Sequence, residues 1–309
     1  MVYLGHTMPI SSKNLAKAVK LIGAKHARFI ALQAKKQDRL ESQWRDRFQA
    51  EVDSVHEKAM QDLIARGKIK KKTVDFEEIV FRHYVESVAA AMGLAEAELD
   101  FLQPPQKRLA KKPPKVQVPN NLRRIREMWD DFQRGGKIPA RQKDLAERIK
   151  SQYLKKVADV WRKNSDTFRK GNAFDQSSAR ESMKKAADVT KSRAKMIVET
   201  ETTNYYNQTR REIYDQADAV THYLFLAIRD QATTKWCTER TVQGKRGRHG
   251  LVYKKGDSLT NRETPAIHWN CRSEMVPLTP YNPRHKKLMN DKSKLRRNNS
   301  CHPLPKGWN

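Results

Sequence analysis

The chain has 309 residues and carries 63 Lys and Arg residues against 35 Asp and Glu residues, a formal net charge of +28. Only 38% of the residues are apolar and 32% are charged, which is a small apolar supply for one compact domain. The positive excess favours a polyanionic partner, because each phosphate that is neutralised releases condensed counterions. We expect a helix-rich protein close to nucleic acid that does not read base sequence; a solvated basic surface without a ligand is the alternative.

The sequence lacks the marks of membrane insertion and of an oxidising compartment. No run of about 18 apolar residues occurs, so we predict no transmembrane span and no membrane partner. The first residues lack the apolar core of a signal peptide. Three cysteines in 309 residues argue against a disulfide scaffold. We expect synthesis in a reducing cytoplasm.

Residues 1–102 are predicted to form a helical hairpin domain. Ser11 and Ser12 are good N-caps for a helix that runs to about Arg66. A second helix is expected from Asp75 to about Gly93. One apolar stripe supports the first helix and comprises Leu40, Trp44, Phe48, Val52, Val55, Ala59 and Leu63.

Residues 103–121 are predicted to be a basic, proline-rich linker, because five prolines exclude a regular helix there. The functional interpretation is an extended arm that lies on phosphates, and the alternative is a solvated connection. Residues 122–190 return to a helical pattern. The candidate nucleic-acid-binding residues in and after the linker are Lys107, Arg108, Lys111, Lys112, Lys115, Arg123, Arg124 and Arg126.

Residues 191–280 differ from the rest, since they combine a polar helix (191–218), an alternating strand (222–229) and a closing segment, PAIHWNCRSEMVP. Thr200, Glu201, Asn204 and Asn207 form a polar row on the helix. We interpret this row as a satisfied network that fixes the packing of the following strand; a carboxylate-centred active site is the alternative.

Cys237, His268 and Cys271 are the candidate metal ligands of this part of the chain. Two thiolates and an imidazole would supply three ligands of a tetrahedral zinc site. Two alternatives are a disulfide between Cys237 and Cys271, and buried side chains that tie the closing segment to the strand. The candidates for a fourth ligand are Asp230, His249, Cys301 and His302.

Residues 281–309 are predicted to be an exposed basic tail, disordered unless it lies on DNA or on a neighbouring chain. The run without apolar periodicity adds Lys292, Lys294, Arg296 and Arg297 to the candidate nucleic-acid-binding residues.

The segment from residue 190 to about residue 278 resembles the head-morphogenesis domain of the Mu F-like minor capsid proteins of tailed phages. The resemblance follows the order Thr200-Glu201, Asp230 and Thr233, Cys237, Gly244 and the closing segment. Pro265, His268, Cys271 and Arg272 match that family's closing Pro-Pro-x-His-Pro-x-Cys-Arg-Cys type of motif, whereas Ala266, Trp269 and Ser273 depart from it. Ser273 replaces a thiol, which weakens the expectation of zinc.

The resemblance implies a virion structural protein inside the capsid, made in the host cytoplasm, near the portal and in contact with packaged DNA. Its implied partners are the portal protein, the major capsid or scaffold protein, and double-stranded DNA bound without sequence specificity. The amphipathic helices would also suit self-association. We expect a mainly α protein with a small α+β C-terminal domain, no enzymatic activity and no cofactor other than structural zinc. The alternative is a metal-dependent nuclease or another DNA-processing enzyme centred on His268.

Overall fold

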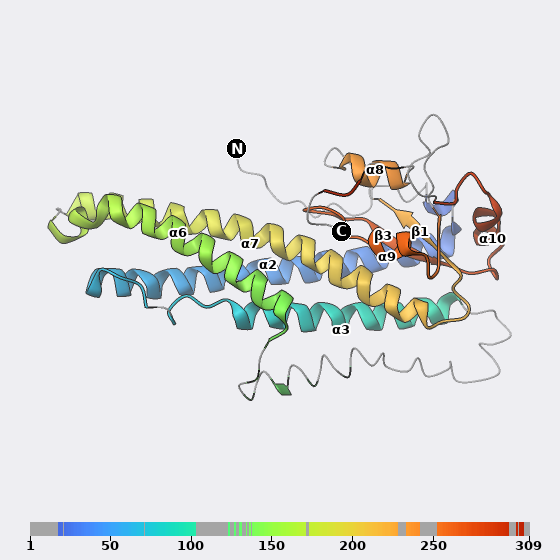
Figure 1. Ribbon diagram of the computed structural model, residues 1–309, viewed down its shortest axis with the longest axis horizontal. Coiled ribbons are helices and arrows are strands. Elements are labelled where there is room, and N and C mark those ends of the chain that lie inside the picture. The colour runs from blue at the N-terminus through green and yellow to red at the C-terminus, as the bar shows by residue number, and fades with distance from the viewer. Residues whose placement is uncertain are drawn as a thin grey trace. The chain divides into compact units, whose positions relative to one another are not determined.

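Figure 1 shows the computed structural model of the protein. It describes residues 18–20, 22–70, 72–102, 138–170, 173–227, 233–241, 252–296, 301 and 303–305, with single positions between 123 and 136. Helices account for 72% of the described residues, and one small antiparallel sheet lies near the C-terminus. The predicted fold class is therefore confirmed.

The chain divides into two compact units. Unit 1 comprises residues 1–40, 87–125 and 200–309, and unit 2 comprises residues 41–86 and 126–199. These units differ from the predicted domains, because α7 (Ala173–Asp215) runs without interruption through residue 190. A helix of 43 residues is long enough to supply different turns to different cores.

Unit 2 is helical in its described residues. It contains the later part of α2 (Ala24–Arg66), the start of α3 (Glu77–Leu102), α6 (Ala140–Lys170) and the first part of α7. The apolar stripe predicted on α2 is confirmed, since Trp44, Phe48, Val52, Val55, Ala59 and Leu63 are all buried. Trp44 and Phe48 each pack against the His83 ring of α3, with ring centroids 5.1 and 5.9 Å apart.

The predicted helix boundaries need two corrections. Gly93 does not end α3, which continues to Leu102, because Leu94, Ala95 and Leu99 extend its buried face. Near the N-terminus, Gly23 interrupts the predicted first helix with a φ of 91°, a conformation that glycine adopts without a steric cost. The helix predicted to end at Arg66 does end there.

Unit 1 is built around a sheet with the order β2-β1-β3, in which β1 pairs antiparallel with both neighbours. The strands are β1 (His222–Leu226), β2 (Val252–Lys254) and β3 (Glu274–Leu278). Two short helices, α8 (Lys235–Thr241) and α9 (Ser258–Arg262), lie between the strands in sequence, and α10 (Pro283–Asn290) follows them.

The side chains of β1 alternate between the two faces of the sheet, as the sequence predicted, and both faces are buried. Tyr223 and Phe225 point into a core with Leu99 of α3 and Ile213 and Tyr214 of α7. Leu224 points into a second core on the opposite face. That second core consists of Ala18, Ile22, Ala27, Ile30, Leu224, Val252, Val276, Leu278 and Leu288.

The tail was predicted to be exposed, and this prediction is wrong for His285, Leu288, Arg296 and Leu304, which are buried, whereas Arg284, Lys287 and Lys292 are exposed. α10 buries His285 and Leu288. The chain then pairs with β2: Val252 N–H donates to Lys294 O at 2.9 Å, and Arg296 N–H donates to Val252 O at 2.7 Å. Leu304 is buried in the same core as Tyr223. The tail therefore completes unit 1, because backbone groups at the edge of a sheet gain stability by pairing.

Unit 1 also encloses two ionic clusters. In the first, Glu98 of α3 accepts hydrogen bonds from Arg210 Nη2 at 2.7 Å and from the Tyr214 hydroxyl, and its other oxygen lies 2.7 Å from His26 Nε2. In the second, Glu263 accepts from Arg240 at 2.9 Å and from Arg296 at 2.8 and 2.9 Å. Among the described residues, no helix combines the length and apolarity required to span a bilayer.

Candidate functional site

The loop through which the closing segment reaches β3 is hydrogen-bonded to side chains of α7. Asn270 adopts a φ of 56°, which Asn tolerates better than most residues, and its backbone N–H donates to Thr200 Oγ1 at 2.9 Å. Asn207 accepts from Met275 N–H at 2.9 Å and donates to Ser273 O at 3.1 Å. Both side chains of α7 therefore hold the backbone that leads into β3.

The polar row on α7 is buried and hydrogen-bonded. Asn204 Nδ2 donates to Glu201 Oε2 at 3.3 Å, and Asn207 Nδ2 also donates to Thr203 O at 2.9 Å. The four side chains, Thr200, Glu201, Asn204 and Asn207, are between 0% and 6% exposed. This arrangement agrees with the predicted packing network and leaves little access for a substrate.

Cys237, His268 and Cys271 come together, as the sequence predicted. Cys237 lies on α8, and the other two lie in the loop before β3. The Cys237 and Cys271 Sγ atoms are 3.7 Å apart, and Cys237 Sγ is 2.9 Å from His268 Nε2. Both cysteines are free thiols, so the alternative of a disulfide is not realised in the structure.

Burial and mutual hydrogen bonding shift the pKa values of the three side chains in different directions. Burial opposes ionisation of Cys271, but hydrogen bonds from Cys237 and His268 hold the pKa of its thiol well below the ordinary value. The hydrogen bond to Cys271, with burial acting in the same direction, raises the pKa of Cys237. Burial would lower the pKa of His268, but interaction with the Cys271 sulfur raises it.

The donor types are those of a zinc site, but the 2.9 Å between Cys237 Sγ and His268 Nε2 is a hydrogen-bond distance, shorter than the roughly 3.5 Å between a sulfur and a nitrogen on one tetrahedral zinc ion. Zinc–sulfur bonds of about 2.3 Å in a tetrahedron place two sulfurs about 3.8 Å apart, close to the 3.7 Å between these thiols. His268 Nδ1 is 2.7 Å from Trp269 O, and such a contact leaves Nε2 as the ligand nitrogen. Ser273 Oγ lies 3.1 Å from Cys237 Sγ, where a third thiol would complete the set. A zinc ion bound here would cross-link α8 to the closing loop.

Three other candidates for the fourth ligand, Asp230, His249 and His302, lie outside the described residues. Among the residues that the structure describes, Cys237, His268 and Cys271 are the group with metal-binding geometry, and Cys301 is not part of it. The structure therefore supports three of the four ligands that a closed zinc site requires.

Arg296 requires a correction among the candidate nucleic-acid-binding residues. It is 8% exposed and forms a bidentate contact with Glu263, because a guanidinium fork matches a carboxylate. Arg123 and Lys292 are exposed, and Lys294 is half-buried. The remaining candidates lie outside the described residues: Lys107, Arg108, Lys111, Lys112, Lys115, Arg124, Arg126 and Arg297.

Sequence reasoning missed the buried charges that organise unit 1. Glu98 lies in a helix rich in apolar residues, and Glu274 opens the apolar run of β3. A charge within an apolar run is a signal for a buried ion pair, but the partner is invisible because Glu98 and Arg210 are separated by 112 positions.

The comparisons with known proteins give no relative for this chain: no protein-family model matches it, and neither a curated protein nor a solved structure is significantly similar.

Proposed function

We propose that the chain is a minor capsid protein for head morphogenesis of a tailed phage. It acts inside the head near the portal and contacts packaged DNA through backbone phosphates. The proposal rests on the resemblance of residues 190–278 to the Mu F-like domain, and one contact carries it further. The Asn270 N–H donates to Thr200 Oγ1, which joins the first and last elements of the resembling motif across 70 positions.

Burial favours a structural role over catalysis for the motif. Cys237, His268 and Cys271 are 3%, 6% and 0% exposed, respectively. A nuclease has to bring its metal and its general base into contact with a phosphodiester, which requires an open site. A buried cluster that ties a helix to a loop is instead suited to holding a fold together during assembly.

The test is co-expression of the tagged chain with the portal, major capsid and scaffold proteins of a tailed phage, the partners that the proposal implies. We expect the portal protein in the purified complex and intact plasmid after incubation with magnesium or manganese. Zinc content is measured on the same sample, since a bound ion would identify the cluster as a structural centre.

The competing function is a metal-dependent nuclease centred on His268. It would be supported by plasmid nicking that requires a divalent metal and is lost in His268→Ala while the variant keeps its thermal stability. That result, together with the absence of any capsid partner in the complex, would falsify the structural proposal.

A further inference from the structure

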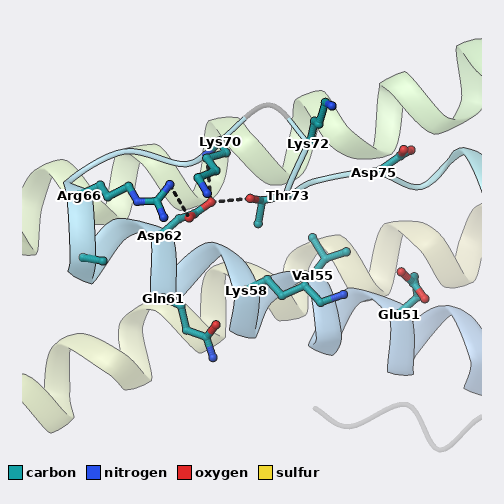
Figure 2. A pocket seen from close by; sticks show the side chains of 11 residues that line it. Glu51, Val55, Lys58, Gln61, Asp62, Arg66, Lys70, Lys72, Thr73 and Asp75 are labelled. Carbon is teal, nitrogen blue, oxygen red and sulfur yellow. Dashed lines mark hydrogen bonds and ion pairs between the residues drawn. The ribbon is translucent and has the colours of Figure 1, made fainter.

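Unit 2 contains a groove that the motif does not explain. One side of the groove is a face of α2, and the other is the connection between α2 and α3, residues 67–76. Its volume is about 420 Å³. The residues that line it are Glu51, Val55, Lys58, Gln61, Asp62, Ala65, Arg66, Lys70, Lys72, Thr73 and Asp75 (Figure 2).

Two of the acidic side chains in the groove already accept hydrogen bonds from other groups of the protein. Asp62 accepts from the Thr73 hydroxyl and from Lys70 N–H at 3.1 Å, and its other oxygen lies 3.8 Å from Arg66 (Figure 2). Asp75 accepts from Glu77 N–H at 2.9 Å, as the N-terminal residue of a helix commonly does. Only Glu51 offers a carboxylate without such a bond in the described part of the chain.

The three lysines of the groove form no ion pair within the described residues. Lys58, Lys70 and Lys72 are exposed, and within the described residues no carboxylate lies at ion-pairing distance from their ammonium groups. Figure 2 shows Lys58 lying along α2, Lys70 on the connection above Asp62, and Lys72 directed outward at the rim. The lining carries four cationic and three anionic side chains, a net charge of +1, and its exposed lysines stand apart from the acids, with Gln61 as a further donor.

We infer that this groove binds the phosphodiester backbone of nucleic acid. Three exposed ammonium groups along the groove suit a chain of phosphates, because each lysine acts as a point charge without demanding a fixed geometry. The Asp62 bonds hold the connection in place, so the lysines stand on an ordered support. The inference rests on the DNA contact of the proposed function and assigns that contact to a defined surface. It can be tested on the chain by itself, without a capsid partner.

The experiment measures binding of the purified full chain to a mixed-sequence DNA duplex of about 30 base pairs between 50 and 300 mM salt. The groove variant is Lys58→Gln/Lys70→Gln/Lys72→Gln. The matched control is Lys155→Gln/Lys156→Gln/Lys163→Gln, which removes equal charge from exposed lysines of α6 that also lack ion pairs. Thermal unfolding of both variants confirms that each is folded.

In the groove variant, we expect the slope of the logarithm of the DNA-binding constant against the logarithm of the salt concentration to become shallower by about two. We also expect binding at least roughly tenfold weaker at 150 mM salt. The control should change the slope by less than one. Equal losses in both variants would mean that only total charge matters and would overturn the inference. The inference would also be overturned if the groove variant lost its binding to anionic phosphatidylglycerol vesicles but kept its binding to DNA. Portal retention in the co-expression test is independent of this result, so the two proposals can fail separately.

Discussion

The ion pairs of unit 1 are mostly buried, whereas most of those of unit 2 are exposed, with Arg45–Glu199 as a partly buried exception. The side chains of Arg210 and Glu98 in unit 1 are 2% and 0% exposed, and those of Arg47 and Glu86 in unit 2 are 48% and 42% exposed. Charges of the same chemical type therefore have different effects. In unit 1 they fix which segments meet, because an unpaired buried charge is costly; in unit 2 they remain available to solvent or to a polyanion.

The strongest test of this comparison is deletion of residues 283–309. The deletion removes α10, the backbone pairing with β2, Arg296 and Leu304, so we expect unit 1 to lose its cooperative unfolding transition while unit 2 stays helical. Amide hydrogen exchange of β1 and α6 measures the two units separately. A control that deletes only residues 306–309 should preserve both, and protected β1 amides after the full deletion would show that the tail is dispensable.

Glu263→Gln is expected to have the next largest effect. The substitution keeps the shape of the side chain but leaves Arg240 and Arg296 buried without a counter-charge, at a cost of about 3–5 kcal/mol. Urea unfolding gives the free energy. Arg262→Gln is the matched control, because Arg262 is 50% exposed and only 3.8 Å from the same carboxylate, and it should cost under about 1 kcal/mol.

Acid should destabilise both units, unit 1 through Glu98 and Glu263 and unit 2 through His83, whose pKa burial lowers to about 3. Burial alone would raise the pKa values of Glu98 and Glu263, but their arginine partners hold both at about 2. Because the folded pKa values lie below the ordinary 4.5, their stabilisation is complete above about pH 4.5 and is lost as the pH falls toward 2. Burial raises the pKa of Glu274, which offsets part of the loss. Hydrogen exchange at pH 7 and pH 3 should show β1 losing protection; unchanged protection of β1 at pH 3 would contradict this prediction.

Asn207→Ala should cost about 2–3 kcal/mol, since it leaves the buried Met275 N–H and Ser273 carbonyl without their partner. Asn204→Ala is the control on the same helix, because the Asn204 side chain bonds to Glu201 on that helix. Faster exchange of the Met275 amide in the first variant alone would locate the loss at β3. Similar costs for the two variants would mean that the closing segment does not depend on Asn207.

The smallest effect is expected at the Arg47–Glu86 pair, whose charged atoms are 2.8 Å apart but exposed. A double-mutant cycle with Arg47→Ala and Glu86→Ala should give a coupling of about 0.2–1 kcal/mol that decreases in high salt. A coupling of several kcal/mol would remove the distinction drawn between the two units.

Local patterns in the sequence predicted the structural features that depend only on residues close together in the chain. The stripe from Trp44 to Leu63 and the alternation of β1 are periodic, so both could be identified before the structure. The convergence of Cys237, His268 and Cys271 followed from residue chemistry. Arg296 could not be assigned correctly, because its basic neighbours gave the pattern of a solvated tail and its partner Glu263 lies 33 positions away.

Gly93 shows why a helix boundary was missed. Glycine is common at the end of a helix, but here the apolar residues after Gly93 continue the buried face of α3, so the helix continues with them. The division into units could not be predicted for a related reason. α7 is polar along its whole length, so no change of composition marks the point where it passes from one core to the other.

The placement of unit 2 within the sequence of unit 1 has a consequence for synthesis on the ribosome. Residues 41–86 and 126–199 have all emerged before β3, α10 and the strand-like segment around Leu295 exist. Ile22 and Ile30 find their apolar partners Val276 and Leu288 only after more than 240 further residues have been synthesised. Unit 2 can therefore fold during elongation, whereas the first segment must wait with its apolar side chains unburied. Nascent chains stalled before residue 270 should accordingly need a chaperone to stay soluble.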